Sequence, residues 1–169
     1  MGVVTRDMTQ EHTYTTTIAW TGNKGTGTVA YDAYARDYEI ACDGKATIRG
    51  SADPKYLGDA KRHNPEEMLV AALSSCHMLW YLHLCAANDI VVEAYEDVAE
   101  GLMLTSPDGS GEFNKVTLRP SVTISAKSDA TEAMHLHMKA NKMCYIARSV
   151  NFSVHHEPEI VLARDDLNY

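Results

Sequence analysis

Residues 64–88 read NPEEMLVAALSSCHMLWYLHLCAAN, and we expect the rest of the chain to be built around them. Pro65 suits the first position of a helix, where its missing N–H costs no hydrogen bond, and Asn64 can cap that end. Glu66 and Glu67 complement the positive end of the helix dipole. The sequence therefore predicts a helix that begins at Pro65 and runs through the stretch.

The body of this predicted helix has almost no polar face. Between Met68 and Ala87 the polar exceptions are few: Ser74, Ser75, His77 and His83. A helix of this kind is buried on most sides. Its length of about 20 residues would also suit a membrane span. The two opening carboxylates and the two histidines favour the buried helix of a soluble protein instead.

Composition limits the class of protein. The 169 residues predict a single domain, residues 1–169, and 45% hydrophobic with 22% charged residues is a globular composition. The net charge of −8 argues against a general nucleic-acid partner. The opening MGVVTRDMTQ has no apolar signal core, and Arg6 stands where a myristoylation pattern requires Ser or Thr. We expect a cytoplasmic protein with no membrane partner.

Strand-forming residues fill the chain before the helix. Three segments are rich in Thr, Tyr, Val and Ile and are separated by turn residues: HTYTTTIAW (12–20), GTVAYDAYA (27–35) and YEIACDGKATI (38–48). They predict two or three antiparallel strands. Residues 50–63 collect Gly, Ser, Asp and Pro and predict a loop that leads into the helix.

After the helix, the pattern predicts a hairpin, a second helix and a last strand. IVVEAYEDVAEGLML (90–104) and KVTLRPSVTISAK (115–127) flank a turn cluster and form the hairpin. Asp129 can cap a helix over residues 130–143. EIVLA (159–163), which follows Pro158, is a short strand. Strands, helix, strands, helix and strand in this order indicate an α+β fold.

The four cysteines show neither zinc-type pairing nor dense disulfide spacing, which indicates free or redox-active thiols. Cys42 is expected to be packing, and so is Cys85, which lies about 180° around the helix from Cys76. A cysteine in an apolar helix most often behaves as a small hydrophobe. Cys76 differs because Cys144 ends the second helix, so packing of the two helices would unite an attacking and a resolving thiol.

Histidines near these cysteines offer alternative chemistry. Thiolate and imidazole ligands suit zinc, and the residues available are Cys76, His77, His83, His135 and His137. Adjacent helical residues diverge by about 100°, so the neighbours Cys76 and His77 are poorly placed to chelate one ion. We therefore expect interior or surface histidines, no metal and no cofactor. A Cys/His hydrolase is a further alternative, but no orienting acid is identifiable.

NPEEMLVAALSSCHMLWYL resembles the OsmC/Ohr family, the osmotically inducible and organic hydroperoxide resistance proteins. A second cysteine in MCYIARSVNFSV, 68 residues after Cys76, and the strings WTGNKGTGT and HEPEIVLA extend the resemblance over nearly the whole chain. The resemblance implies an α+β fold with antiparallel sheets around a long buried central helix. It also implies an intertwined homodimer, which would explain a helix without a polar face.

The resemblance further implies peroxidase chemistry. The Cys76 thiolate attacks a hydroperoxide and becomes a sulfenic acid, Cys144 resolves it as a disulfide, and a dithiol reductant restores both thiols. Glu66 matches the family's catalytic carboxylate. Apolar residues around Cys76 favour organic over inorganic peroxides: Met68, Met78, Leu79 and Trp80.

The family also uses an arginine to hold the thiolate and the peroxide, a task that suits a permanently charged guanidinium. Arg36, in YARDYEI, ranks first among the candidates, Arg49 second, and Arg62 remains open. Residues 56–59, YLGD, contain no arginine where many family members have one.

Glu66 and Cys76 are ten residues apart, which separates them by about 15 Å along a straight helix. The helix must bend, an arginine must bridge them, or Glu66 must reach Cys76 of the partner subunit. The alternative to an enzyme is a non-catalytic OsmC-like dimer that binds a small apolar ligand.

Overall fold

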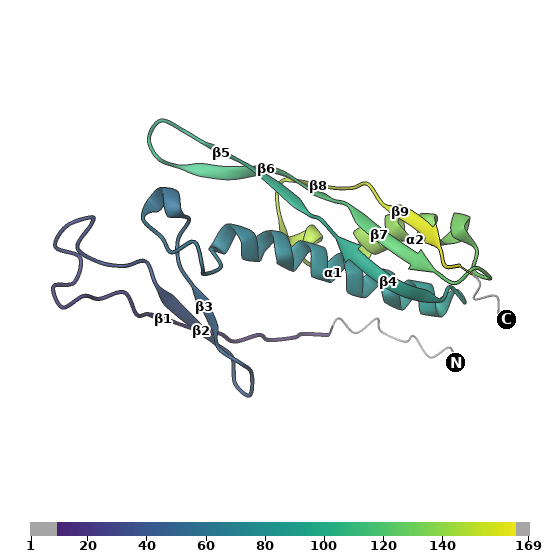
Figure 1. The fold of residues 1–169 in the computed structure, drawn as a ribbon, viewed down its shortest axis with the longest axis horizontal. Helices are drawn as coiled ribbons and strands as arrows, with labels where there is room; N and C mark the ends of the chain where they lie inside the picture. The colour runs from purple at the N-terminus through teal and green to yellow at the C-terminus, as the bar shows by residue number, and fades with distance from the viewer. Residues whose placement is uncertain (1–9, 165–169) are drawn as a thin grey trace, which may run out of the picture. The chain divides into compact units, whose positions relative to one another are not determined.

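The computed structural model describes residues 10–164, and the chain divides into two compact units, Met1–Pro65 and Glu66–Tyr169. In the first unit, three short strands form an antiparallel sheet in the order β1-β2-β3 (Figure 1). They are β1 (Thr17–Trp20), β2 (Tyr38–Ala41) and β3 (Ile48–Gly50). The predicted loop before the long helix contains only a short 3-10 helix, η1 (Pro54–Tyr56).

The predicted strand at residues 27–35 is wrong, because this segment forms a series of turns. The Arg36 side chain holds it by donating hydrogen bonds to the carbonyl oxygens of Tyr31 (2.5 Å) and Tyr34 (2.6 Å). The guanidinium also lies over both rings, 4.3 and 4.2 Å from their centroids. Carbonyls that a neighbouring strand would use are thus occupied by a side chain.

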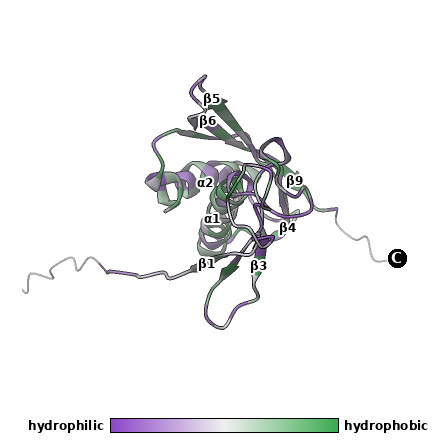
Figure 2. Ribbon diagram, turned by 90° about the vertical axis from the view of Figure 1, so that its left-hand side faces the viewer, coloured by the Kyte–Doolittle hydropathy of each residue, from purple (hydrophilic) through white to green (hydrophobic). Residues whose placement is uncertain are grey.

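Both helices of the second unit occupy the predicted residues. The long helix α1 spans Pro65–Ala87 and α2 spans Ala130–Met143. The Asp129 carboxylate caps α2 by accepting the N–H groups of Thr131 (2.8 Å) and Glu132 (3.1 Å). In Figure 2 the ribbon of α2 alternates between hydrophilic and hydrophobic colours, as an amphipathic helix does.

Two three-stranded sheets complete the second unit, in the orders β4-β7-β9 and β5-β6-β8. The strands are β4 (Val92–Asp97), β5 (Glu100–Thr105), β6 (Gly111–Leu118), β7 (Pro120–Ile124), β8 (Ser153–His156) and β9 (Glu159–Leu162). β4 pairs with β7 and β5 with β6 in antiparallel fashion, whereas β8 and β9 join in parallel. The sheets are therefore mixed, not wholly antiparallel as predicted.

The predicted hairpin exists, but both of its arms change sheet midway. The crossing lies between β4 and β5 on one arm and at Arg119 on the other. The Asp97 carboxylate joins this crossing to α1, because it accepts the Arg119 backbone N–H (2.7 Å) and the Ser74 hydroxyl (2.5 Å). Pro120, which follows, has no N–H to continue the ladder.

Two apolar clusters form the core of the second unit. The first joins α1, α2 and β7 through Tyr81, Leu84, Cys85, Ile90, Val122, Ile124, Ala133, Leu136 and Ala140. The second centres on Leu73, Val116 and Leu118. By length and composition α1 could cross a membrane, but it is the core helix of this unit. Its other side remains open in the single chain, where Leu79 is 62% exposed.

Candidate active site: a thiol pair between two helices

The structure brings Cys76 and Cys144 together. Cys76 is half-buried in the middle of α1, and Cys144, only 1% exposed, forms the C-terminal cap of α2. The two side chains are near enough to interact, because Cys76 raises the pKa of the Cys144 thiol. Neither sulfur is in a disulfide, so the chain is described in its dithiol form.

Burial decides the protonation of Cys144. Burial, together with the smaller effect of Cys76, raises the pKa of this thiol to about 11, against the opposing effect of the Ala147 N–H. That N–H donates to Cys144 Sγ at 3.4 Å from the short 3-10 helix η2 (Ala147–Ser149). Cys144 therefore stays protonated at neutral pH and can donate its S–H to Cys76.

A buried histidine pair lies beside the thiols. His77 Nε2 and His137 Nδ1 are 3.0 Å apart, and the planes of their rings are nearly parallel, with an interplanar angle of 6°. Burial lowers the pKa of His77 to about 4 and that of His137 to about 3, with His156 contributing to both. Both imidazoles are thus neutral at pH 7, and a single N–H lies between them.

Sequence reasoning missed this pair, although it marked both histidines as interior or surface residues. The available signal was spacing, since His77 follows Cys76 directly and His137 precedes Cys144 by two helical turns. The other two marked histidines are exposed: His83, whose ring meets Trp80 edge-on at 5.8 Å, and His135. Across residues 10–164, no group of three His, Cys, Asp or Glu is arranged to hold a metal ion.

Glu66 lies one position inside the start of α1, and the structure does not bring it to Cys76 of the same chain. α1 is an uninterrupted α-helix over the ten intervening residues. The two side chains are therefore separated by about 15 Å along the helix axis.

The three candidate arginines differ in their partners within the first unit. Arg36 contacts carbonyl oxygens and tyrosine rings, and in the described part of the chain it has no carboxylate partner. Arg36 thus keeps its positive charge free of a neutralising partner. The other two form ion pairs: Arg49 with Glu39 at 3.8 Å, and Arg62 with Asp37 at 3.3 Å and Asp59 at 3.5 Å.

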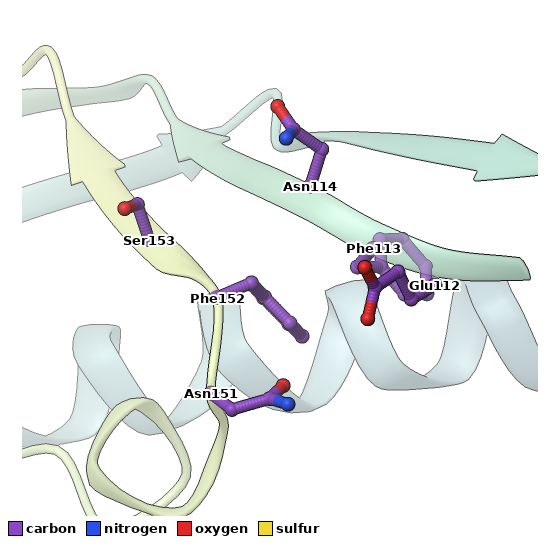
Figure 3. A pocket seen from close by; sticks show the side chains of 6 residues that line it. All are labelled: Glu112, Phe113, Asn114, Asn151, Phe152 and Ser153. Carbon is purple, nitrogen blue, oxygen red and sulfur yellow. The ribbon is translucent and has the colours of Figure 1, made fainter.

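A surface hollow of about 240 Å³ lies between β6 and the start of β8 (Figure 3). The rings of Phe113 and Phe152, 5.5 Å apart, form its apolar part. Both rings pack against the second core cluster, and so do Ile146 and Ala147, which follow Cys144 closely in the chain. The other residues that line the hollow are polar: Glu112, Asn114, Asn151 and Ser153.

Comparison with known proteins identifies the family of the chain. The family model described as OsmC-like protein matches residues 58–159. An OsmC-like protein of unknown function from Vibrio cholerae is 32% identical, with 88% of this chain and 99% of that one covered and a TM-score of 0.79. This chain belongs to the OsmC-like protein family.

Other relatives are more distant. An uncharacterized Bacillus subtilis protein, YmaD, is 27% identical over 105 residues, which is 60% of this chain and 69% of that protein. A structure named as an organic hydroperoxide resistance protein OsmC, from Legionella pneumophila, shares the fold at 16% identity. Its TM-score is 0.63, with 90% of this chain and 98% of that one covered. The α+β fold that the resemblance implied is thereby confirmed.

Proposed function

We propose that this protein is a thiol-dependent peroxidase that reduces organic hydroperoxides through Cys76 and Cys144. The observation that carries the proposal is that Cys76 in α1 interacts with Cys144 at the end of α2 and raises the pKa of its thiol. Membership of a family whose structural neighbours include named hydroperoxide resistance proteins supports it.

The reaction balances with a hydroperoxide and a dithiol as the two co-substrates. The Cys76 thiolate attacks one peroxide oxygen, the O–O bond breaks, and the alcohol leaves after taking a proton, so that Cys76 becomes a sulfenic acid. The Cys144 sulfur then attacks Cys76, and the hydroxyl leaves as water with the Cys144 proton. A dithiol reductant exchanges with the disulfide and is itself oxidised.

The environment of Cys144 suits the second step. Because burial raises its pKa to about 11, Cys144 remains a thiol and does not compete with Cys76 for the peroxide. Its proton becomes transferable when the Cys76 hydroxyl leaves. The Ala147 N–H can stabilise the charge that develops on the Cys144 sulfur during the attack.

Arg36 and Glu66 complete the proposed site. Arg36 holds the thiolate and the peroxide, a role supported by the absence of a carboxylate partner among the described residues. Glu66 acts on Cys76 of the partner subunit in a homodimer, because it lies too far along α1 from Cys76 of its own chain. We place the protein in the cytoplasm, where thiols are kept reduced.

Peroxide-driven disulfide formation tests the proposal. The reduced protein is mixed with cumene hydroperoxide or hydrogen peroxide, and free thiols are counted while mass spectrometry maps new bonds. We expect two thiols lost per chain and a Cys76–Cys144 disulfide, faster with cumene hydroperoxide. Cys76→Ser must abolish the loss, whereas Cys42→Ser, a matched control, must leave it unchanged. Thiols that persist, or a loss unaffected by Cys76→Ser, would favour the alternative, a non-catalytic dimer that binds a small apolar ligand.

A further inference from the structure

We propose that the hydrogen bond between His77 and His137 sets the position of α2 against α1 and thereby holds the Cys144 thiol at the Cys76 thiol. The two histidines are positioning residues, and they act through the cysteines. The inference rests on the proposed function only in taking this thiol pair as the redox centre.

The first support is that the same two helices carry both contacts. On α1, Cys76 and His77 are consecutive. On α2, His137 and the cap residue Cys144 are seven residues apart, which puts them on one face, separated by about 10 Å along the axis. Any rotation or shift of α2 that breaks the imidazole contact therefore also moves the Cys144 sulfur.

Apart from the thiols and the aromatic rings, the cluster that the two helices share is apolar among the described residues, and apolar contacts are not directional. α1 offers Leu84 and α2 offers Ala133, Leu136 and Ala140 to the shared cluster. Apolar side chains of this kind keep favourable contacts after small shifts. A hydrogen bond needs its donor and acceptor aligned, so it distinguishes one arrangement from its neighbours.

The orientation of the imidazole pair is itself restricted. The Tyr81 ring, also on α1, stacks on His137 with 3.8 Å between centroids and an interplanar angle of 12°. The centroid of the His77 ring lies 5.7 Å from that of the His156 ring in β8. His137 is therefore aligned by two side chains of α1, and β8 limits the movement of His77.

The pair also costs stability, which argues that packing alone does not explain it. The outer nitrogens, His77 Nδ1 and His137 Nε2, are buried without a hydrogen-bond partner among the described residues. Unsatisfied buried polar atoms are unfavourable, and an apolar pair of similar shape would avoid that cost. Single buried polar contacts that lower stability while fixing helix register are known from coiled coils.

The test measures the disulfide equilibrium with dithiothreitol, so no peroxide is involved. Oxidised dithiothreitol and the Cys76–Cys144 dithiol exchange to give the protein disulfide and reduced dithiothreitol. We expect His77→Leu and His137→Leu each to lower this equilibrium constant about tenfold, the factor for one lost hydrogen bond. The double variant should lose no more than either single variant, because both changes remove one interaction.

Conservative variants separate positioning from general packing. The amide of Gln reaches the place of His Nε2 and that of Asn the place of His Nδ1, so His77→Gln and His137→Asn should restore most of the constant. Leu136→Ala is the matched control, because it removes buried apolar contacts beside His137. It should lower the urea midpoint while leaving the disulfide constant nearly unchanged.

Three results would overturn the inference. The first is a disulfide equilibrium constant that is unchanged in both Leu variants. The second is a constant that decreases as much in Leu136→Ala as in the Leu variants when the loss of stability is equal. The third is a pair of amide variants that fold but do not recover the constant. Failure of the proposed function is detected separately, as absence of peroxide oxidation of Cys76 in a Cys144→Ser chain. That result would leave the dithiothreitol equilibrium and its dependence on His77 and His137 intact.

Discussion

At the level of single residues, the proposed site depends on the protonation of Cys144 and on the ion-pairing state of Arg36. Cys144 is kept as a thiol by burial, which raises its pKa to about 11. Within residues 10–164, Arg36 has no carboxylate partner, because its contacts are carbonyl oxygens and aromatic faces. Neither property is visible in residue type alone, since the chain has other cysteines and arginines in different surroundings.

The arginine assignment makes a prediction at this scale. Arg36→Gln should slow the oxidation of Cys76 by cumene hydroperoxide on the order of a hundredfold, because a charged donor to the reacting atoms is lost. Stopped-flow measurement of sulfenic acid formation in a Cys144→Ser background gives the rate. Arg49→Gln is the matched control, since Arg49 forms an exposed ion pair with Glu39. Equal rates in the two variants would exclude Arg36 from this role.

At the scale of elements, local chemistry made both helices predictable. Pro65 and Asp129 mark helix starts through backbone and capping chemistry that acts within a few residues, and both helices begin there. The turns at 27–35 escaped prediction because a side chain outside the segment, Arg36, holds them. Parallel addition of β8 and β9 was missed for a similar reason, since pairing depends on distant strands.

In the candidate site, too, some features could be predicted from local sequence and others depend on tertiary contacts. The two cysteines could be chosen from the sequence, because each stands out on its predicted helix. The contact between His77 and His137 could not be predicted from the sequence, because it depends on which faces of α1 and α2 meet. Tertiary packing decides those faces, whereas spacing shows only that each histidine lies near a cysteine on its own helix.

The histidine pair makes stability depend on pH. His77 and His137 have pKa values lowered to about 4 and about 3 by burial, so they stay neutral in the folded chain where unfolded histidines take up protons. Since the unfolded state then binds more protons, the free energy of unfolding should fall as pH decreases from about 6.5 towards 4. The limiting slope is about 1.4 kcal/mol per pH unit for each histidine.

Urea unfolding between pH 7 and pH 4.5 measures this slope. The His156 ring faces His77 and its pKa is also lowered by burial, so it adds to the same decrease. The double variant His77→Gln/His137→Asn should show a clearly flatter profile, whereas His135→Gln, at an exposed position of α2, should not. A profile in the double variant as steep as that of the wild type would contradict the assignment.

At the scale of the whole molecule, α1 carries more apolar surface than one chain covers. The helix buries Leu73, Tyr81 and Leu84 within its own unit, while Leu79 remains 62% exposed. Exposed apolar side chains on a core helix favour association with a matching surface. A second copy of the chain supplies one and also resolves the separation of Glu66 from Cys76, which is why we propose a homodimer.

Mixed dimers test whether each site draws on both subunits. Glu66→Ala chains keep Cys76, and Cys76→Ser chains keep Glu66, so each homodimer should be inactive. If Glu66 serves Cys76 of the partner subunit, each heterodimer regains one complete site. A statistical mixture, half of which is heterodimer, should then recover about a quarter of the wild-type peroxidase activity. Mixing Cys76→Ser with the double variant Glu66→Ala/Cys76→Ser is the control and must give none. Absence of recovery in heterodimers isolated by two affinity tags would show that sites are not shared, because such dimers hold both intact residues on opposite subunits.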